Sequence, residues 1–138
     1  MSNLIKVLLV EDDPDQLFLF QQVFNVMGLL TIPATSIAEA MKMVSIDRPD
    51  IVLLDVMLHH ENGLDIMEKL KNDASTKDIP IVVFTNTNKQ EYRDRAKQLG
   101  AIDFIIKSQT IPQEMAAKVK AYVENGTTEQ SSALNRQL

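Results

Sequence analysis

The sequence predicts an α/β fold in which helices cover both faces of a doubly wound, five-stranded parallel sheet. The first observation is a set of short, continuous apolar runs at residues 8–10, 51–54, 81–84 and 104–106. Aliphatic and β-branched runs without alternation are typical of strands that are buried on both faces. The second observation is that amphipathic segments with helix start and stop signals separate these runs, which favours right-handed βαβ crossovers.

The first half of the chain contains two helices with clear start signals. After the first strand, Asp13 supplies a capping acceptor ahead of Pro14, and Gly28 closes the helix. A weaker strand is expected at residues 29–33, and residues 36–39 form a capping box that starts the second helix. The residues expected on the core faces of these two helices are Leu17, Phe20, Val23, Phe24 and Met27, then Ile37, Ala40, Met41 and Val44.

Three further helices are expected in the second half of the chain. Their start signals are Gly63, Asn88 with Glu91, and Thr110 with Gln113. Gly100 ends the second of these three helices. The residues expected on their core faces are Ile66, Met67 and Leu70, then Tyr92, Ala96 and Leu99, then Met115, Val119 and Tyr122. The whole pattern reads βαβαβαβαβα.

The size and composition of the chain restrict its class. Its 138 residues predict one domain at 1–125, followed by a polar tail or linker start at 126–138. There is no cysteine, which excludes disulfides and thiolate metal sites. No apolar stretch approaches the ~20 residues of a membrane span, so we expect a cytoplasmic protein without a membrane partner. The net charge is −5 without a basic run, so no direct nucleic-acid partner is expected.

Polar side chains stand at the carboxyl end of each of the four clearest strands. Glu11 and Asp12 follow the first strand, and Asp55 follows the second. Thr85 and Lys107 follow the other two strands. Ligands of open α/β sheets bind beyond the carboxyl ends of the strands, so we expect these five side chains to converge.

The three carboxylates of this set predict a divalent metal site. Acids at one sheet edge repel each other unless a cation neutralises them, and oxygen ligands at this density favour Mg²⁺. We expect Asp12 to be a direct ligand and Glu11 to act through water. The backbone carbonyl of Met57, two residues after Asp55, would complete the shell.

The other two side chains predict phosphoryl chemistry. Lys107 is a mobile point charge that can move toward a phosphoryl group, and the Thr85 hydroxyl can donate to a phosphoryl oxygen. An aspartate held beside Mg²⁺, a lysine and a hydroxyl is suited to attack phosphorus and form an acyl phosphate. Asp55 is the residue expected to do so.

An ordered set of motifs carries a family resemblance: Val10-Glu11-Asp12-Asp13, Asp55-Val56-Met57-Leu58 with Asn62-Gly63, Thr85, and Phe104-Ile105-Ile106-Lys107. Over about residues 4–124 the chain resembles the receiver domain of two-component response regulators, with the flavodoxin-like (βα)5 fold of chemotaxis proteins. The resemblance implies that Asp55 is the phosphoacceptor beside an acidic pair at 11–12. It also implies that Thr85, Phe104 and Lys107 form the switch set.

The resemblance also implies the partners. The phosphoryl donor would be a phosphohistidine on a sensor histidine kinase or a histidine phosphotransfer protein. Phosphorylation would remodel the surface of the fourth helix, fifth strand and fifth helix, where Lys89, Arg93 and Lys97 are candidate contacts for an output partner. A phosphorylation-dependent homodimer stays open. Such a domain is not a conventional enzyme, although it assists its own phosphorylation and dephosphorylation.

Three residues depart from the receiver pattern. Ser108 stands where receivers usually have a proline, and His59 stands where they typically have another proline. Asn86 replaces the usual alanine or glycine after the threonine. We expect Asn86 to narrow access to Asp55 and to alter the rates of phosphorylation and hydrolysis.

A second surface is expected on the first helix. Leu19 and Val26 project away from the core stripe, with Gln22 between them. In receivers this flank docks kinases or phosphotransfer helices. We therefore expect Leu19, Gln22 and Val26 to form a partner-docking patch.

Other functions stay open from the sequence. Ser108 and Asn86 also suit a phosphorylation-independent interaction module on the same fold. Hydrolases that use an aspartyl phosphate normally show Asp-x-Asp, whereas Met57 follows Asp55 at that spacing. A flavodoxin-like cofactor binder would need a Ser/Thr/Gly-rich phosphate loop after the first strand, where this chain is acidic.

Overall fold

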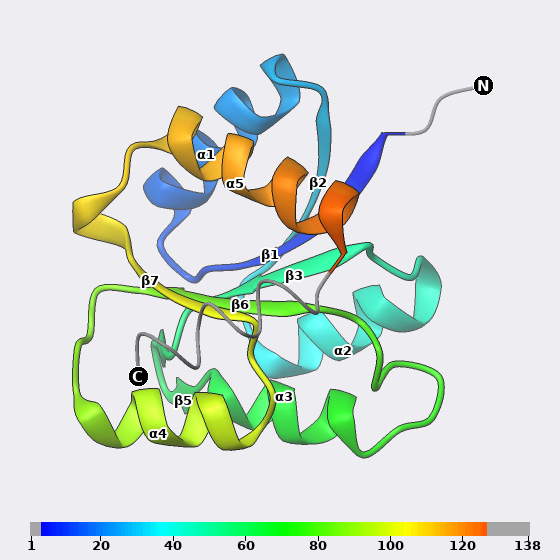
Figure 1. Cartoon of the computed structure of the whole chain (residues 1–138), viewed down its shortest axis with the longest axis vertical. Helices are drawn as coiled ribbons and strands as arrows, with labels where there is room; N and C mark the ends of the chain where they lie inside the picture. The colour runs from blue at the N-terminus through cyan, green and yellow to red at the C-terminus, as the bar shows by residue number, and fades with distance from the viewer. Residues whose placement is uncertain (1–3, 127–138) are drawn as a thin grey trace.

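The computed structural model of the chain describes residues 4–126 and confirms the predicted α/β fold (Figure 1). The strands of the main sheet are β1 (Ile5–Val10), β2 (Leu29–Ala34), β3 (Ile51–Leu54), β6 (Ile81–Thr85) and β7 (Asp103–Ile106). They lie in the order β2-β1-β3-β6-β7 and all pairs are parallel. The strand β2, which contains Pro33, and the strand β7 are therefore the two edges.

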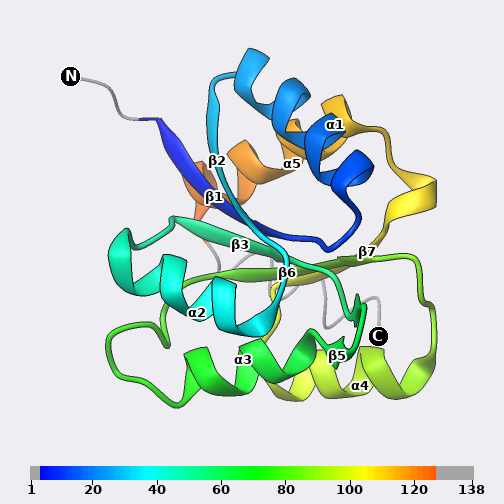
Figure 2. The same ribbon diagram turned by 180° about the vertical axis from the view of Figure 1, so that it is seen from behind.

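Within residues 4–126, five α-helices cover the sheet in two layers. They are α1 (Pro14–Val26), α2 (Ile37–Ile46), α3 (Leu64–Lys71), α4 (Gln90–Gln98) and α5 (Pro112–Asn125). Helices α1 and α5 lie on one face, and α2, α3 and α4 lie on the other (Figures 1 and 2). This is the doubly wound arrangement that the alternation of strands and helices predicts.

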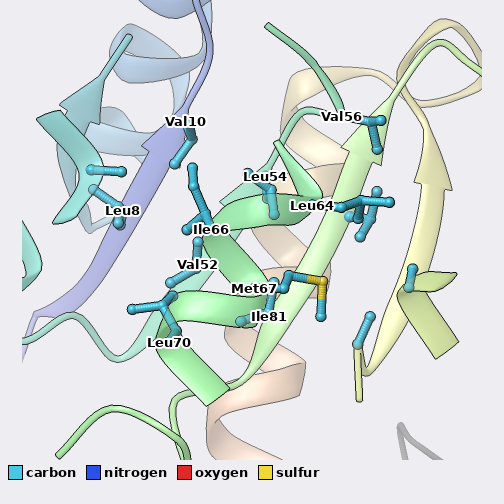
Figure 3. Close-up of a cluster of buried hydrophobic side chains, with 14 of the residues drawn as sticks. Leu8, Val10, Val52, Leu54, Val56, Leu64, Ile66, Met67, Leu70 and Ile81 are labelled. Atoms are coloured by element: carbon cyan, nitrogen blue, oxygen red, sulfur yellow. The ribbon is translucent and has the colours of Figure 1, made fainter. Parts of the chain in front are cut away.

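Alternate side chains of β1 pack into the two hydrophobic cores, one on each face of the sheet. Leu8 and Val10 join the cluster under α2, α3 and α4, part of which is drawn in Figure 3. Val7 and Leu9 join the cluster under α1 and α5, where Phe24 is fully buried. Successive side chains of a strand point to opposite faces, so this burial follows directly from a continuous apolar run.

The start signals of α1 and α2 are confirmed. The Asp13 carboxylate accepts a hydrogen bond from the backbone N–H of Asp15 at 2.9 Å. The Ser36 hydroxyl accepts from the backbone N–H of Glu39 at 3.1 Å. In a capping box the Glu39 carboxylate would accept from the backbone N–H of Ser36. Here it accepts from the backbone N–H of the preceding residue, Thr35, at 2.7 Å.

The predicted cap of α4 is wrong. The helix begins at Gln90 after Lys89, and no side chain caps its first turn. The side-chain oxygen of Asn88 instead accepts from Nε of Arg93 at 2.7 Å. Asn88 is therefore one residue too early to cap the helix and is used to hold an arginine.

The predicted start of α5 is also wrong. Thr110 follows a short 3₁₀ turn at Lys107–Gln109, and α5 begins two residues after it, at Pro112. Proline suits the first helical position because its missing N–H would be unpaired there anyway. The Glu114 carboxylate, and not Gln113, accepts from the backbone N–H that precedes the helix, at 3.2 Å.

A small hairpin between β3 and α3 has no counterpart in the sequence prediction. Its strands are β4 (Met57–Leu58) and β5 (Glu61–Asn62), paired antiparallel. The hairpin returns the chain to Gly63, whose N–H donates to the carbonyl of Val56 at 2.8 Å. A Cβ at Gly63 would lie 1.9 Å from the Asp55 carbonyl oxygen, so only glycine fits at this start of α3.

Two further predictions concern the limits of the chain. No helix among residues 4–126 is long and apolar enough to cross a membrane. The predicted tail begins at Gly126, and its residues 127–138 lie outside the described part of the chain.

Candidate functional site

The carboxyl ends of β1, β3, β6 and β7 meet at one edge of the sheet. The chain leaves β1 toward β2 on one side and reaches β3 on the other, so the strand order reverses between β1 and β3. In open α/β sheets this reversal opens a crevice at the carboxyl edge. The structure brings four of the predicted side chains into direct contact there, namely Glu11, Asp55, Thr85 and Lys107.

The carboxylate of Asp55 is at the centre of this cluster and is only 7% exposed. Its Oδ1 accepts from the hydroxyl of Thr85 at 2.6 Å and from the backbone N–H of Met57 at 3.0 Å. Its Oδ2 accepts from Nζ of Lys107 at 2.7 Å. Each carboxylate oxygen is therefore held in a fixed direction by groups from different strands.

The ammonium of Lys107 bridges two acids. It donates to Oδ2 of Asp55 and also to Oε1 of Glu11. The second oxygen of Glu11 accepts from the backbone N–H of Asp13 at 3.0 Å. Each oxygen of Glu11 thus has a partner within the protein.

Burial sets the protonation behaviour of this pair. Burial raises the pKa of Asp55, and the nearby charge of Asp12 raises it further, while bonds from Thr85 and Met57 oppose the shift. Burial lowers the pKa of Lys107 to about 8. Both charged forms are therefore less favourable here than in water.

Asp12 lies beside the cluster and is more accessible. Its side chain is 20% exposed, against 9% for that of Asp55. The exposed His59, at the tip of the β4–β5 hairpin, has its Nδ1 4.0 Å from an oxygen of Asp12. A carboxylate that faces solvent next to a buried one leaves an approach for a ligand.

The donor set fits Mg²⁺ as an open site and not as a closed cage. Among residues 4–126, no three His, Cys, Asp or Glu side chains are arranged to hold a metal ion. Lys107 and Asp13 already bond to the two oxygens of Glu11, whereas the charge of the more exposed Asp12 acts on Asp55. Mg²⁺ typically takes one or two carboxylates and keeps waters or phosphate oxygens for the rest of its shell.

Comparison with known proteins decides the family. Residues 7–120 match the family model described as the response regulator receiver domain. The chain belongs to the response regulator receiver family. It is therefore a receiver domain of two-component signalling, as the resemblance of the motifs predicts.

Individual relatives agree with this assignment. The phosphate regulon transcriptional regulatory protein PhoB of Klebsiella pneumoniae is 34% identical over 116 residues, which cover 84% of this chain and 50% of PhoB. The polar-differentiation response regulator DivK of Brucella anthropi is 28% identical over 117 residues, which cover 85% of this chain and 94% of DivK. The chain thus spans about half the length of PhoB.

Solved receiver structures have the same fold. The chemotaxis response regulator CheY4 of Vibrio cholerae gives a TM-score of 0.77 at 20% identity, covering 86% of this chain and 98% of CheY4. A CheY-like receiver domain protein of Methanospirillum hungatei gives 0.81 at 21% identity, covering 95% and 99%.

Two departures from the receiver pattern contact each other, which sequence reasoning missed. The side-chain oxygen of Asn86 accepts from the backbone N–H of Ser108 at 2.8 Å. Both residues are exposed and stand directly after Thr85 and Lys107. No peptide bond between residues 4 and 126 is cis, so the Lys107–Ser108 bond is trans.

Phe104 is held in a buried position on the face of β7 that α4 covers. It is 5% exposed, and the guanidinium of Arg93 lies 4.6 Å from the centre of its ring. Asn88 holds that guanidinium from the β6–α4 loop. The sequence singled out Phe104 and Arg93 separately but did not predict their contact. A sequence pattern does not tell how the side chain of one element is directed toward a residue of another element.

The residues predicted for partner docking lie on the exposed side of α1. Leu19 is 45% exposed and Val26 is 87% exposed. Gln22 and Val26 line a cavity of about 210 Å³ that Gln113 of α5 also lines. Phe18, which the sequence analysis did not select, is 63% exposed on the same helix.

Proposed function

We propose that Asp55 accepts a phosphoryl group from a phosphohistidine donor, with Mg²⁺ bound at the same edge of the sheet. The observation that carries the proposal is the buried Asp55 carboxylate, bonded to both Thr85 and Lys107 and adjacent to the more exposed Asp12. The family assignment supports it, because receiver domains act by phosphorylation of an aspartate.

The transfer step forms one bond to phosphorus and breaks another. A carboxylate oxygen of Asp55 attacks phosphorus and forms an acyl phosphate. The bond between phosphorus and the donor imidazole nitrogen breaks, and its electron pair stays on that nitrogen, which takes up a proton. Lys107 and Thr85 then have phosphoryl oxygens to contact in addition to the carboxylate.

The metal would be held by Asp12, Asp55 and the Met57 carbonyl, with Glu11 acting through water. When bound, Mg²⁺ supplies positive charge that lets a negative phosphoryl group approach two carboxylates. The charge of Asp12 raises the pKa of Asp55, which is consistent with a site that needs a cation.

The switch would act through Thr85 and Lys107, which already bond to Asp55 before it is phosphorylated. Hydrogen bonds to charged groups contribute roughly 1.5–3 kcal/mol each, and a change from 1:99 to 99:1 needs about 5.5 kcal/mol. Thr85 and Lys107 already bond to the Asp55 carboxylate, so phosphorylation adds only the difference between the two sets of bonds. The two contacts are therefore barely adequate as a switch, and we propose that a bound partner contributes to the change.

We propose the surface of α4, β7 and α5 as the output face. A groove of about 560 Å³ lies there and is lined by Arg93, Phe104 and Lys118, among others. Phosphorylation would act on this face through Thr85 and Phe104. Lys89 and Lys97 remain candidate contacts for an output protein, an output domain or a second copy of the chain.

The donor would dock at Leu19, Gln22 and Val26. The partner would be a sensor histidine kinase or a histidine phosphotransfer protein, whose helices present the phosphohistidine. On this proposal the chain is a phosphoacceptor that assists its own phosphorylation and dephosphorylation, and not a conventional enzyme. The domain limits at residues 125 and 126 stay a prediction.

Intact mass after incubation with acetyl phosphate and Mg²⁺ tests the proposal. The wild-type chain should gain the mass of one phosphoryl group, and Asp55→Ala should gain none. Omission of Mg²⁺ should abolish the gain, and beryllofluoride should bind wild type only. A wild-type chain that shows neither mass gain nor beryllofluoride binding would be a phosphorylation-independent interaction module.

A further inference from the structure

A hydrogen bond joins the segments that follow β6 and β7, next in sequence to Thr85 and Lys107 of the candidate site. The two strands are neighbours, and Thr85 of β6 is in register with Ile106 of β7. The next residue in one loop is Asn86, and Ser108 follows Lys107 in the other. The bond from the Ser108 N–H to the Asn86 side chain therefore links the residues that directly follow Thr85 and Lys107.

This bond requires a backbone N–H at position 108 and a side-chain acceptor at position 86. A proline at position 108 would have no N–H to donate. An alanine or glycine at position 86 would have no side-chain acceptor. Asn86 and Ser108, which are two of the three departures from the receiver pattern, thus supply the acceptor and the donor of one bond.

The bond acts on the short turn from which Lys107 projects. The other end of this turn is closed by the backbone N–H of Thr110, which donates to the Lys107 carbonyl at 3.1 Å. Ser108 N–H is the donor at its start. Removing the Asn86 acceptor would leave the turn held at one end only, so the Lys107 ammonium would be less precisely placed against Asp55.

We propose that Asn86 is a positioning residue that holds Lys107 against Asp55 through the Ser108 N–H and couples its movement to that of Thr85. The inference rests on the proposed function, because its readout is the phosphorylation of Asp55. It differs from a steric role of Asn86, in which the side chain only narrows access. The steric role predicts faster phosphorylation when Asn86 is truncated, and the positioning role predicts slower phosphorylation.

Four variants test the proposal: Asn86→Ala, Ser108→Pro, the double variant, and Ser108→Ala as a matched control that keeps the N–H. The rate of phosphorylation by acetyl phosphate with Mg²⁺, the affinity for beryllofluoride and the thermal midpoint are measured for each. Asn86→Ala and Ser108→Pro should each slow phosphorylation by up to about tenfold, as expected for the loss of one hydrogen bond that positions a reacting group. Ser108→Ala should match wild type.

The double variant should be no slower than the slower single variant, because each substitution removes the same bond. The thermal midpoint of Asn86→Ala should stay at the wild-type value, since both side chains are exposed and no cavity forms. An unchanged or faster Asn86→Ala, or fully additive single effects, overturns the positioning role. Failure of the wild-type chain to be phosphorylated would overturn the proposed function instead.

Discussion

At the scale of single residues, the chain places an acid where its charge is costly. Asp55 is buried, and its neighbour Asp12 has the same charge. Hydrogen bonds from Thr85, Met57 and Lys107 offset part of this cost. The remaining imbalance keeps the pKa of Asp55 above its ordinary value.

The substitution Asp55→Asn should therefore stabilise the metal-free protein at pH 7. Because the pKa of Asp55 is higher in the folded than in the unfolded state, the folded state binds more protons in the window above the unfolded pKa of 3.8. The contribution of this group to stability falls as pH rises through that window. Urea unfolding at pH 7 and at pH 4 should show an advantage of Asp55→Asn that shrinks at the lower pH.

The exposed Glu124→Gln serves as the control for this measurement, and its stability should follow that of wild type at both pH values. A lower stability of Asp55→Asn than of wild type at pH 7 would mean that the bond to Lys107 outweighs the burial of the charge.

Gly63 is a second residue with a local requirement. Gly63→Ala would force a Cβ against the Asp55 carbonyl, and we expect a loss of about 1–3 kcal/mol or more in the free energy of unfolding. Gly28→Ala is the comparison, because Gly28 has a positive φ of 86° but only a lysine side-chain tip within 4.0 Å. Its loss should be about 1–2 kcal/mol. Chemical denaturation of both variants measures the difference, and equal stability of Gly63→Ala and wild type would contradict the steric argument.

At the scale of elements, the sequence predicted those strands and helices that have a continuous apolar run or a periodic apolar stripe. The five strands and five helices follow from buried runs and core-facing stripes. The β4–β5 hairpin was missed because two-residue strands have no periodicity. The α4 and α5 start signals were wrong because Asn88 and Thr110 have alternative partners or positions, and a capping pattern in sequence does not exclude them.

The corrected start of α5 can be tested directly. Glu114→Ala removes the acceptor for the N–H before the helix, and we expect it to cost about 0.5–2 kcal/mol, as for other helix caps. Thr110→Ala should change stability by less than about 0.5 kcal/mol, as for other surface positions. Urea unfolding compares the two variants. A larger loss for Thr110→Ala would restore the original sequence prediction.

The exposed face of α1 gives a prediction about partner recognition. Leu19→Asp should slow phosphotransfer from a cognate phosphohistidine protein roughly 5–30-fold, equivalent to a loss of about 1–2 kcal/mol of interface energy. Phosphorylation by acetyl phosphate should be unaffected. Leu30→Asp is the matched control, because Leu30 is 42% exposed but lies on β2. Equal slowing with both donors would reject docking at Leu19.

At the scale of the whole molecule, the fold gathers a site from four strand ends that are far apart in the chain. This convergence was predictable, because parallel strands end at the same edge and each run is followed by a polar residue. The contacts within the site were not predictable. The Asn86–Ser108 bond and the stacking of Arg93 on Phe104 depend on loop geometry and side-chain direction.

Mg²⁺ should stabilise the whole domain if Asp12 and Asp55 hold it. A ligand of the folded state alone adds about 2.7 kcal/mol at 100 times its dissociation constant. The thermal midpoint of wild type should rise with added MgCl₂ and fall back with EDTA. Asp12→Ala should lose most of this response. A wild-type midpoint that is independent of Mg²⁺ would argue against the open metal site.

The edge strand β2 has a consequence for how copies of the molecule meet. The Ala34 carbonyl accepts from the backbone N–H of Glu11, so the polar backbone groups of Ala34 face β1. Successive residues of a strand direct these groups to opposite sides, so those of Pro33 face the outer edge, where proline has no N–H to donate. Another chain adding a strand along β2 would meet a gap in the ladder at that point. This edge of the sheet therefore resists the addition of a strand from a second copy of the chain.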